Sequence, residues 1–423
     1  MQNYRFRSIF LPLILTTLFS CSSTPKKPSF TGRYVAHVEL ESTRLLATEL
    51  LSGLETPWDI TWGEDGWIWI NEHKGTVSRL NPETGEHQTL LQVPDVHFQR
   101  AMGLLSMALH PEFSQHPYIW LHYVYATGED EFNTRIVRYR FDEDTLTDRT
   151  VIADPLPGDH IHNGSRMVID VDGYLWFGGG ELNRPERSQD LSTYHGKVLR
   201  MHQDGSIPED NPIAGSPVWT SGHRNIQGLA FGNGFLYAAE HGANTDDEIN
   251  LIQKGGNYGW PDVQGYCDSE AEKAFCADSL VIEPLHAFTP VVAAAGLAYY
   301  NHPAIPEWQN SLLLANLRIQ ALRILPLSED GKEVNDVQIF FQQTFGRLRD
   351  VTIDPDGRVY LATSNMDWYK TVRPDIHDVA LEERGDRIIL LQPLTEELEK
   401  KFANVDEPVT LREDTTPLYL GDN

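Results

Sequence analysis

Short runs of alternating apolar and polar residues recur along the whole chain, and most of them are broken by a tight turn. In the clearest copies, a strand pattern, an Asp-Gly or Asn-Gly pair and a second strand pattern follow one another. These copies span Pro57–Asn71, Arg166–Gly178, Leu229–Glu240 and Asp350–Thr363, and two looser copies begin at Met107 and Leu297. Such a pair between alternating runs is the strongest short-range signal of a β-hairpin. The pattern therefore predicts six hairpins.

Each hairpin is followed by a second pair of predicted strands, so the repeating unit has four strands. Six four-stranded antiparallel units are typical of an all-β fold, the six-bladed β-propeller. A pair of β-sandwiches is the alternative, although a sandwich requires no recurring unit. We expect the propeller to span residues 34–395, with a strand in Tyr34–Leu51 pairing with the last strands. Residues 396–423 form a C-terminal tail, and only Thr395–Ala403 has a helical pattern.

The first apolar stretch, Ile9–Phe19, is typical of an export signal and is too short to span a membrane. It leads into Leu-Phe-Ser-Cys, which resembles the lipobox of bacterial lipoproteins. The resemblance implies a signal peptide over residues 1–20, a lipid on Cys21 and a polar tether over residues 21–33. An ordinary signal peptide with a chance cysteine is the alternative. In lipoproteins a serine after the cysteine favours the outer membrane, so we expect a periplasmic protein held only by its lipid.

The composition indicates a large globular protein with an acidic surface. Of the 423 residues, 40% are hydrophobic and 10% are aromatic, which suffices for a large core. The formal net charge of −27 repels nucleic acid phosphates and is compatible with divalent cations. Apart from Cys21, the chain has two cysteines, Cys267 and Cys276, which an oxidising periplasm would allow to pair.

The densest group of polar and glycine-rich motifs lies in Gly222–Pro261, which contains GHRNIQG, EHGA, DEIN and NYGWP in this order. These motifs resemble the soluble pyrroloquinoline quinone (PQQ) dependent glucose and aldose sugar dehydrogenases. Further matching motifs begin at Gly103, His162, Gly196 and Arg347. The resemblance covers roughly residues 50–395, and it implies an oxidoreductase that uses PQQ and calcium to oxidise aldose sugars.

The resemblance also implies which residues hold PQQ, a planar quinone with three carboxylates. Arg347 and Arg349 match arginines that contact PQQ, and their i, i+2 spacing on a strand directs both side chains to one face. A solvated surface pair is the alternative. Arg224 and Asn225 match residues near the reactive carbonyl, where a fixed cation stabilises developing negative charge. Arg318 stands where the family has a PQQ-contacting lysine.

His162 matches the catalytic histidine of the family. The role that this implies is to take the proton from the sugar C1 hydroxyl while hydride leaves C1 for the quinone, for which a neutral imidazole is suited. His160 lies two residues away and can be confused with it, and Asp159 can orient either ring. In the GHRN motif we expect His223 to be structural, whereas Gln227 either lines the site or satisfies backbone groups.

Two calcium sites are implied by the same resemblance. The carbonyls of Gly242 and Ala243 match ligands of the catalytic ion, and a backbone ligand tolerates alanine where the family usually has proline. Glu248, the Tyr258 carbonyl and Asp268 match a second, structural ion. Oxygen ligands suit a hard cation. A solvated acidic turn is the alternative for this segment.

Several positions depart from the family pattern. Ile161 replaces the aspartate that precedes the histidine in glucose-type members, and Ala101 replaces a glutamine or glutamate. Phe288 stands for a tryptophan beside the cofactor, and Arg318 for the lysine. These changes alter the predicted quinone pocket.

Three functions are compatible with these observations. The first is a PQQ- and calcium-dependent aldose dehydrogenase that passes electrons to a periplasmic quinone or cytochrome. The second is an inactive or repurposed propeller that binds a glycan or a protein, which would explain Ala101, Ile161 and Phe288 together. The third is a calcium-dependent lactonase, which requires central carboxylates where this chain supplies arginines. The chain has no G-x-S-x-G, H-E-x-x-H or strand-linked G-x-G-x-x-G motif.

Overall fold

The computed structural model describes residues 32–368 and 385–402. The predicted signal peptide, Cys21 and most of the tether lie outside these residues, as do residues 403–423 of the predicted tail. None of the helices in the described ranges is long and apolar enough to cross a bilayer.

The described residues form six antiparallel sheets, which we number as blades in chain order. Blade 1 contains β3 (Pro57–Trp62), β4 (Ile68–Glu72), β5 (Thr76–Leu80) and β6 (His87–Gln92). Blade 2 contains β7 (Leu104–Leu109), β8 (Tyr118–Gly128), β9 (Glu131–Asp142) and β10 (Thr145–Pro157). Blade 3 contains β11 (Gly164–Ile169), β12 (Tyr174–Gly179), β13 (Val198–His202) and β14 (Val218–Thr220).

The second half of the chain repeats this arrangement. Blade 4 contains β15 (Ile226–Gly232), β16 (Phe235–Glu240), β17 (Asp247–Ile252) and β18 (His286–Phe288). Blade 5 contains β19 (Ala294–Tyr300), β20 (Ser311–Asn316), β21 (Ala321–Pro326) and β22 (Gln338–Phe340). Blade 6 contains β23 (Leu348–Ile353), β24 (Val359–Thr363), β25 (Asp386–Pro393), β2 (Arg44–Leu54) and β1 (Arg33–Glu39).

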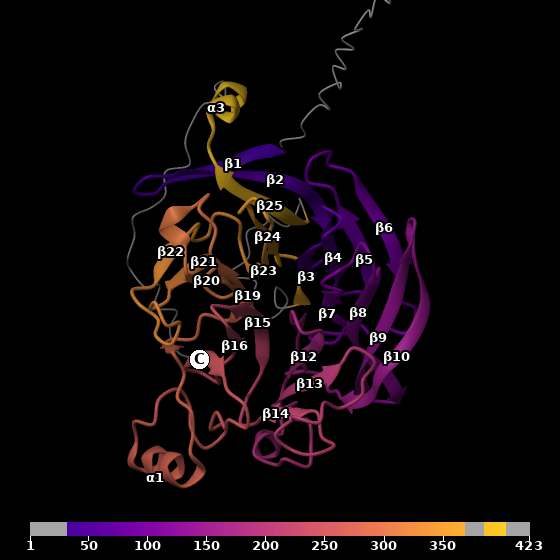
Figure 1. Ribbon diagram of the computed structural model, residues 1–423, viewed down its shortest axis with the longest axis vertical. Coiled ribbons are helices and arrows are strands. Elements are labelled where there is room, and N and C mark those ends of the chain that lie inside the picture. The colour runs from indigo at the N-terminus through magenta and orange to yellow at the C-terminus, as the bar shows by residue number, and fades with distance from the viewer. Residues whose placement is uncertain (1–31, 369–384, 403–423) are drawn as a thin grey trace, which may run out of the picture.

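The blades form a closed ring (Figure 1). The first strand of each blade contacts the first strand of the next, from β3 through β7, β11, β15, β19 and β23 and back to β3. This ring confirms the predicted six-bladed propeller and rules out the pair of sandwiches. Hydrophobic clusters fill the space between neighbouring blades, as where Leu45 of blade 6 packs with Leu313 of blade 5.

The two ends of the described chain close the ring together. Leu46 of β2 lies opposite Gln392 of β25, and Thr48 lies opposite Leu390. The predicted pairing of an N-terminal strand with the last strands is therefore confirmed. The single strand expected in Tyr34–Leu51 is in fact two strands, β1 and β2, so blade 6 has five strands instead of four.

A buried ion network crosses the centre of the ring. Arg166 of β11 lies 2.8 Å from Asp59 of β3 and 2.9 Å from Asp350 of β23. Ser106 of β7 donates a hydrogen bond to Asp59 at 2.9 Å. Four of the six inner strands are thus tied together by side chains, because buried charges require partners.

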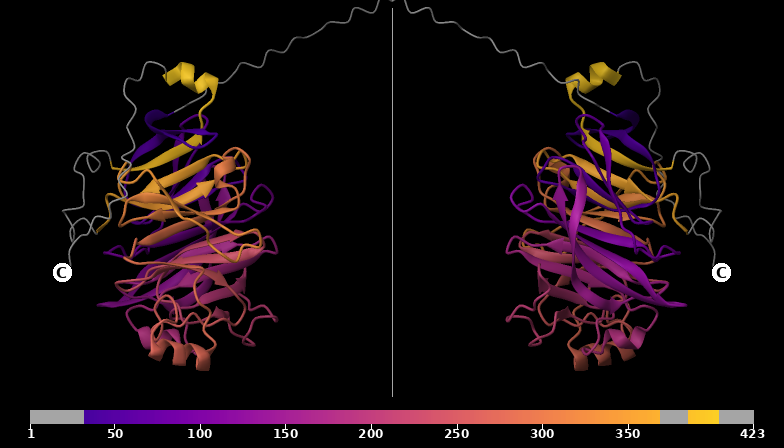
Figure 2. Two further views of the ribbon diagram at one scale, coloured as in Figure 1. Left: turned by 90° about the vertical axis from the view of Figure 1, so that its left-hand side faces the viewer. Right: turned by 90° about the vertical axis from the view of Figure 1, so that its right-hand side faces the viewer.

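The two α-helices of the described residues, α1 and α3, lie at opposite ends of the propeller (Figure 2). Helix α3 (Glu396–Phe402) confirms the helical pattern at the C-terminal end. Helix α1 (Glu270–Ser279) was not predicted, although Ser269 and Glu272 form a capping box that the sequence S-E-A-E indicates. Short 3-10 turns cover Pro185–Ser188 and Pro306–Trp308. Cys267, just before α1, forms a disulfide with Cys276 within α1, as the sequence allowed.

Candidate functional site

The loop before β11 and the loop after β12 bring His162 and Glu181 together. Gly164 pairs with Gly179 in the β11–β12 hairpin. His162, two residues before Gly164, therefore lies opposite Glu181, two residues after Gly179. His162 Nδ1 lies 2.5 Å from Glu181 Oε1, and the Glu181 side chain is buried. His162 itself has a left-handed backbone with φ of 52°. Strained residues of this kind cluster at functional sites.

Arg224 contacts the other nitrogen of the same ring. Its Nη2 lies 3.4 Å from His162 Nε2, and its Nη1 donates to the carbonyl of His241 at 3.1 Å. An arginine can only donate, so Nε2 accepts and Nδ1–H donates to the Glu181 carboxylate. This network assigns a neutral tautomer with a lone pair on Nε2.

Arg347 and Arg349 of blade 6 point to one side of β23, as the alternation predicted. Arg347 Nη2 donates to Asp367 Oδ2 at 2.8 Å, and Arg349 Nη2 lies 3.4 Å from the same oxygen. The Arg349 guanidinium stacks 3.9 Å from the centre of the Trp58 ring. Both arginines are buried, so the alternative of a solvated surface pair is wrong.

The electrostatics around Arg349 favour an anionic ligand. Burial lowers its pKa to about 10; Asp367 opposes this shift, and the positive charges of Arg347 and Arg166 add to it. A negative group placed there would compensate the buried charge. Arg224 has a pKa lowered by burial, and its buried Nε has no hydrogen-bond partner among the described residues.

His241 marks the point toward which these groups converge. Burial lowers the pKa of the His241 ring to about 4; the negative charge of Asp247 opposes this shift, and the positive charges of Arg224 and Arg349 add to it. Arg224 contacts both the His162 ring and the His241 carbonyl, so the predicted residues His162 and Arg224 share one site. The positive charge of Arg349 from blade 6 also acts on the His241 ring.

The loop after β16 carries the predicted calcium ligands Gly242 and Ala243, and it is compact. A Cβ on Gly242 would lie 1.9 Å from the carbonyl oxygen of Thr245, so only glycine fits there. The Gly242 N–H donates to buried Asp247 at 2.9 Å, and Asp247 also accepts from the Val292 N–H at 2.8 Å. These bonds fix the backbone that carries the Gly242 and Ala243 carbonyls.

The residues of the second predicted calcium site have other partners. Glu248 accepts hydrogen bonds from Asn250 and from the Gly265 N–H, each at 2.9 Å, and burial raises its pKa to about 8. Asp268 is exposed, and the Tyr258 hydroxyl donates to Leu251. No three His, Cys, Asp or Glu side chains gather as a metal site in the described residues, so both calcium sites stay predictions.

Several other sequence assignments can be placed. The His223 ring is buried, with Nδ1 at 2.8 Å from Glu240 Oε1 and Nε2 at 2.8 Å from Thr220 Oγ1, which agrees with the structural role expected for it. Gln227 donates to the Gly164 carbonyl at 3.1 Å, so it satisfies the backbone. Asn225 is also buried in the scaffold, where it accepts from the Gly164 N–H at 3.1 Å.

The positions that depart from the family pattern lie in different surroundings. Arg318 is exposed, and its backbone N–H donates to Val292. Phe288 is buried, and the guanidinium carbon of Arg323 lies 5.0 Å from the centre of the Phe288 ring. Ala101 accepts a hydrogen bond from Asn163 through its carbonyl, which any residue at this position would supply.

The structure separates the two neighbouring histidines. His160 Nε2 lies 3.1 Å from Asp130, whereas His162 faces Glu181. Asp159 accepts from the backbone N–H of His160, so it orients the loop instead of the His162 ring.

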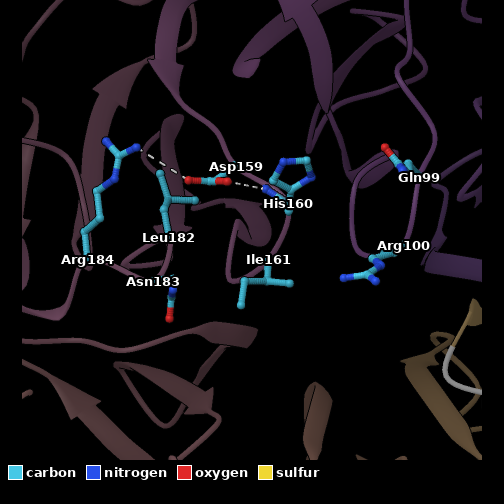
Figure 3. A pocket seen from close by; sticks show the side chains of 8 residues that line it. All are labelled: Gln99, Arg100, Asp159, His160, Ile161, Leu182, Asn183 and Arg184. Atoms are coloured by element: carbon cyan, nitrogen blue, oxygen red, sulfur yellow. Dashed lines mark hydrogen bonds and ion pairs between the residues drawn. The ribbon is translucent and has the colours of Figure 1, made fainter. Parts of the chain in front are cut away.

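A cavity of about 460 Å³ lies beside the loop that carries His162. Figure 3 shows Arg184 and Arg100 on opposite sides of it, with Asp159, His160 and Ile161 between them. We call this space the inner cavity. The lining includes Ile161, the residue before His162, and does not include His162 itself.

Sequence reasoning missed Glu181, His241 and Trp58. Glu181 could have been found from the hairpin, because a turn at Asp172-Gly173 places residues 162 and 181 across from each other. His241 lay within the EHGA motif, but its burial depends on packing between blades. Trp58 gave no signal, since its contact with Arg349 joins residues almost three hundred positions apart.

Comparison with known proteins gives consistent results. The family model for Glucose / Sorbosone dehydrogenase matches residues 54–369. Quinoprotein glucose dehydrogenase B of Acinetobacter calcoaceticus is 38% identical, over 82% of this chain and 89% of that protein. Aldose sugar dehydrogenase YliI of Escherichia coli is 32% identical, over 73% and 87%.

A solved structure agrees with these relatives. The PQQ-bound aldose sugar dehydrogenase of Streptomyces coelicolor has a TM-score of 0.71 and 30% identity, and the match covers 83% of this chain and 98% of that one. With most of the propeller matched in sequence and in structure, the chain belongs to the Glucose / Sorbosone dehydrogenase family.

Proposed function

We propose that this protein is a PQQ-dependent dehydrogenase that oxidises aldose sugars at C1 to lactones. The observation that carries the proposal is the His162 ring, which is held between Glu181 and Arg224. Relatives named as quinoprotein glucose dehydrogenase and aldose sugar dehydrogenase support the same reading.

The residues present fit PQQ. Its carboxylates require cations, and Arg347 and Arg349 supply two buried guanidiniums from blade 6. The lowered pKa of Arg349 favours an anionic ligand, and the buried Nε of Arg224, which has no hydrogen-bond partner among the described residues, can donate to a polar ligand. When bound, PQQ supplies the two-electron acceptor for the hydride.

His162 acts as the general base. The Arg224 contact at 3.4 Å is long, so the Nε2 lone pair is available to a stronger donor such as a sugar hydroxyl. The O–H bond at O1 breaks and its proton goes to Nε2. The C1–H bond also breaks, and its hydrogen leaves with the bonding electrons as hydride. The electrons of the O–H bond form the lactone carbonyl. Glu181 holds Nδ1–H and stabilises the charged ring that results.

Calcium is part of the proposal. The Gly242 and Ala243 carbonyls offer oxygen ligands on a loop whose backbone is fixed by Asp247, which suits a hard cation. The proposed second ion lies at Glu248, Tyr258 and Asp268. A cation beside the buried Glu248 carboxylate would offset the charge repulsion from Glu240 that helps to raise its pKa.

The site of action follows from the first residues of the chain. The proposed signal peptide and the lipid on Cys21 place the propeller in the periplasm, anchored in the outer membrane through the tether. Electrons then pass to a periplasmic acceptor. The Cys267–Cys276 disulfide agrees with an oxidising compartment.

Cofactor reconstitution tests the proposal. The chain from residue 22 is stripped of metal and titrated with PQQ with and without Ca²⁺, and the quinone absorbance is followed during addition of glucose, xylose or maltose. We expect stoichiometric binding that needs Ca²⁺, followed by sugar-dependent reduction. An absence of PQQ binding would contradict the proposal and favour a glycan-binding or protein-binding propeller.

A further inference from the structure

Trp58 joins three blades around the candidate site. It lies on β3 of blade 1 and is buried. The guanidinium carbon of Arg349, from blade 6, lies 3.9 Å from the centre of the indole ring. The indole N–H donates a hydrogen bond at 3.3 Å to Oγ of Ser165 in blade 3, three residues after His162. One side chain therefore contacts both the arginine predicted to hold the cofactor and the segment that carries the candidate base.

The contact with Trp58 is the close one that orients Arg349. Among the described residues, Arg349 makes only long hydrogen bonds: Nε and Nη2 lie 3.4 and 3.5 Å from Ser364 Oγ, and Nη2 lies 3.4 Å from Asp367 Oδ2. Arg347, by contrast, donates to the same Asp367 oxygen at 2.8 Å. Long hydrogen bonds fix a side chain weakly, whereas a planar guanidinium stacks well on an indole. Nη1 of Arg349 makes no hydrogen bond to the described residues, so it remains a donor for a ligand.

His73 supports the indole from behind without adding a charge. Its ring centre lies 4.0 Å from that of Trp58, and the side chain is buried. Burial lowers the pKa of His73 to about 3; the positive charge of Arg349 adds to this shift, and Asp367 opposes it. The imidazole is therefore neutral near pH 7 and does not repel the guanidinium. A Cβ on Gly103 would lie 2.2 Å from His73 Cδ2, so a close backbone fixes the histidine in turn.

We propose that Trp58 is a positioning residue, which holds the Arg349 guanidinium ready for a carboxylate of the bound cofactor. Only 5% of Trp58 is exposed, so its own ring is not available to stack on a ligand and it acts through Arg349. A guanidinium that is already oriented loses little freedom when the ligand binds, which strengthens binding. The inference rests on the dehydrogenase function proposed above and adds a residue that acts on its cofactor.

Equilibrium binding of PQQ tests this inference without any sugar present. The quinone absorbance is followed in the presence of Ca²⁺, and the Kd is measured for each variant. Trp58→Leu removes the aromatic ring and should raise the Kd about tenfold, within the range of a desolvated cation–π contact. Trp58→Phe keeps a flat aromatic face and should raise it by about threefold at most. In an Arg349→Ala background, Trp58→Leu should change the Kd by less than about twofold, because no guanidinium is left to orient.

Trp62→Leu is the matched control. Trp62 lies four residues further along β3, and its ring stacks on that of Tyr360 in blade 6 with ring centres 5.8 Å apart. The control thus removes a similar contact between blades 1 and 6. It should lower the melting temperature and leave the Kd for PQQ unchanged. An equal rise of the Kd in Trp62→Leu would overturn the positioning role, as would a full effect of Trp58→Leu in the Arg349→Ala background.

The outcomes separate the inference from the proposed function. If the wild type binds PQQ and Trp58→Leu binds it equally well, the positioning role is overturned and the dehydrogenase stands. If the wild type does not bind PQQ, the proposed function fails, and calorimetry with trimesate, a flat aromatic ring with three carboxylates, decides the role of Trp58. Trimesate binding that is weakened about tenfold in Trp58→Leu and unchanged in Trp62→Leu supports that role. An absence of trimesate binding, or equal binding by Trp58→Leu, overturns it.

Discussion

In the proposed mechanism His162 is the base, and its two ring nitrogens face groups of opposite charge. Glu181 fixes the proton on Nδ1, and Arg224 leaves Nε2 as the acceptor. The arrangement resembles the way in which a buried carboxylate holds an imidazole in one tautomer in many enzymes. The proposed mechanism therefore depends on Glu181, a residue that need not touch the substrate.

Glu181→Gln tests this positioning role. Glutamine keeps the size of the side chain but removes the charge and offers either an oxygen or an NH₂ to Nδ1. We expect kcat for aldose oxidation to fall by about 10²-fold, within the range of general-base effects, with little change in KM. Glu181→Asp should retain more activity than Glu181→Gln because it keeps the carboxylate. Equal activity of the glutamine variant and the wild type would contradict the assigned tautomer.

The sequence predicted part of the site because local rules apply to it. Arg347 and Arg349 share a face through strand alternation, and His162 follows from its motif. Glu181 depends on hairpin register and Trp58 on ring closure, neither of which a local pattern contains. Arg318 lies exposed, so its predicted contact with PQQ stays a prediction.

Among the elements, β8 carries a buried histidine at the boundary between two blades. His122 packs 4.5 Å from the Phe177 ring of blade 3, and neither ring nitrogen has a hydrogen-bond partner among the described residues. Burial lowers its pKa to about 3. The ring is therefore neutral in the folded protein, whereas the unfolded chain binds a proton near pH 6.5.

This difference makes blade packing sensitive to acid. Stability from a neutral His122 is fully present above pH 6.5 and is lost as the pH falls toward 3, at about 1.4 kcal/mol per unit. His122→Phe should therefore lose about 2 kcal/mol less than the wild type between pH 7 and pH 5 in denaturant titrations. His116→Gln, at an exposed position, is the control and should behave as the wild type. Identical acid loss in His122→Phe would show that this histidine is not the sensitive group.

The disulfide across α1 gives a prediction for a surface element. Helix α1 has no buried residue, so the Cys267–Cys276 bond replaces a hydrophobic contact that the helix lacks. A loop of this length contributes about 2–3 kcal/mol by constraining the unfolded segment. Cys276→Ser should increase proteolytic cleavage within residues 262–284 and leave the melting of the propeller unchanged. A large drop in melting temperature would mean that α1 supports the blades.

At the scale of the whole molecule, ring closure by blade 6 determines stability. Strand β2 supplies Leu45 and Ala47 to the core between blades 5 and 6, and Leu50 and Leu54 to the core between blades 6 and 1. Strand β1 pairs with the outer edge of β2 and adds Ala36 and Val38 to the core between blades 5 and 6. The first part of the described chain thus joins two interfaces that the rest of the propeller cannot complete.

Truncation of the chain distinguishes these two strands. A chain that begins at residue 42 lacks β1 and should melt cooperatively at a lower temperature. A chain that begins at residue 55 also lacks β2, exposes the edge of β25 and should show no cooperative transition. Calorimetry measures both. A cooperative transition in the shorter chain would mean that the ring is stable without this closure.

The overall fold was predictable because its signal is repeated. The strand and Asp-Gly pattern recurs in several blades, so a hairpin whose own pattern is weak can be identified from the clearer copies. The fifth strand of blade 6 could not be predicted in this way, because β1 and β2 have no Asp-Gly turn between them and belong to a sheet formed by distant residues.

In the proposed reaction, His162 removes the proton from O1 while hydride leaves C1. A single turnover of the PQQ-loaded protein with glucose, and with glucose deuterated at C1, measures this step directly through the quinone absorbance. We predict that deuterium slows the reduction several-fold and that His162→Ala reduces the rate by at least about 10²-fold while PQQ still binds. Reduction that is insensitive to deuterium and unchanged in His162→Ala would contradict the account.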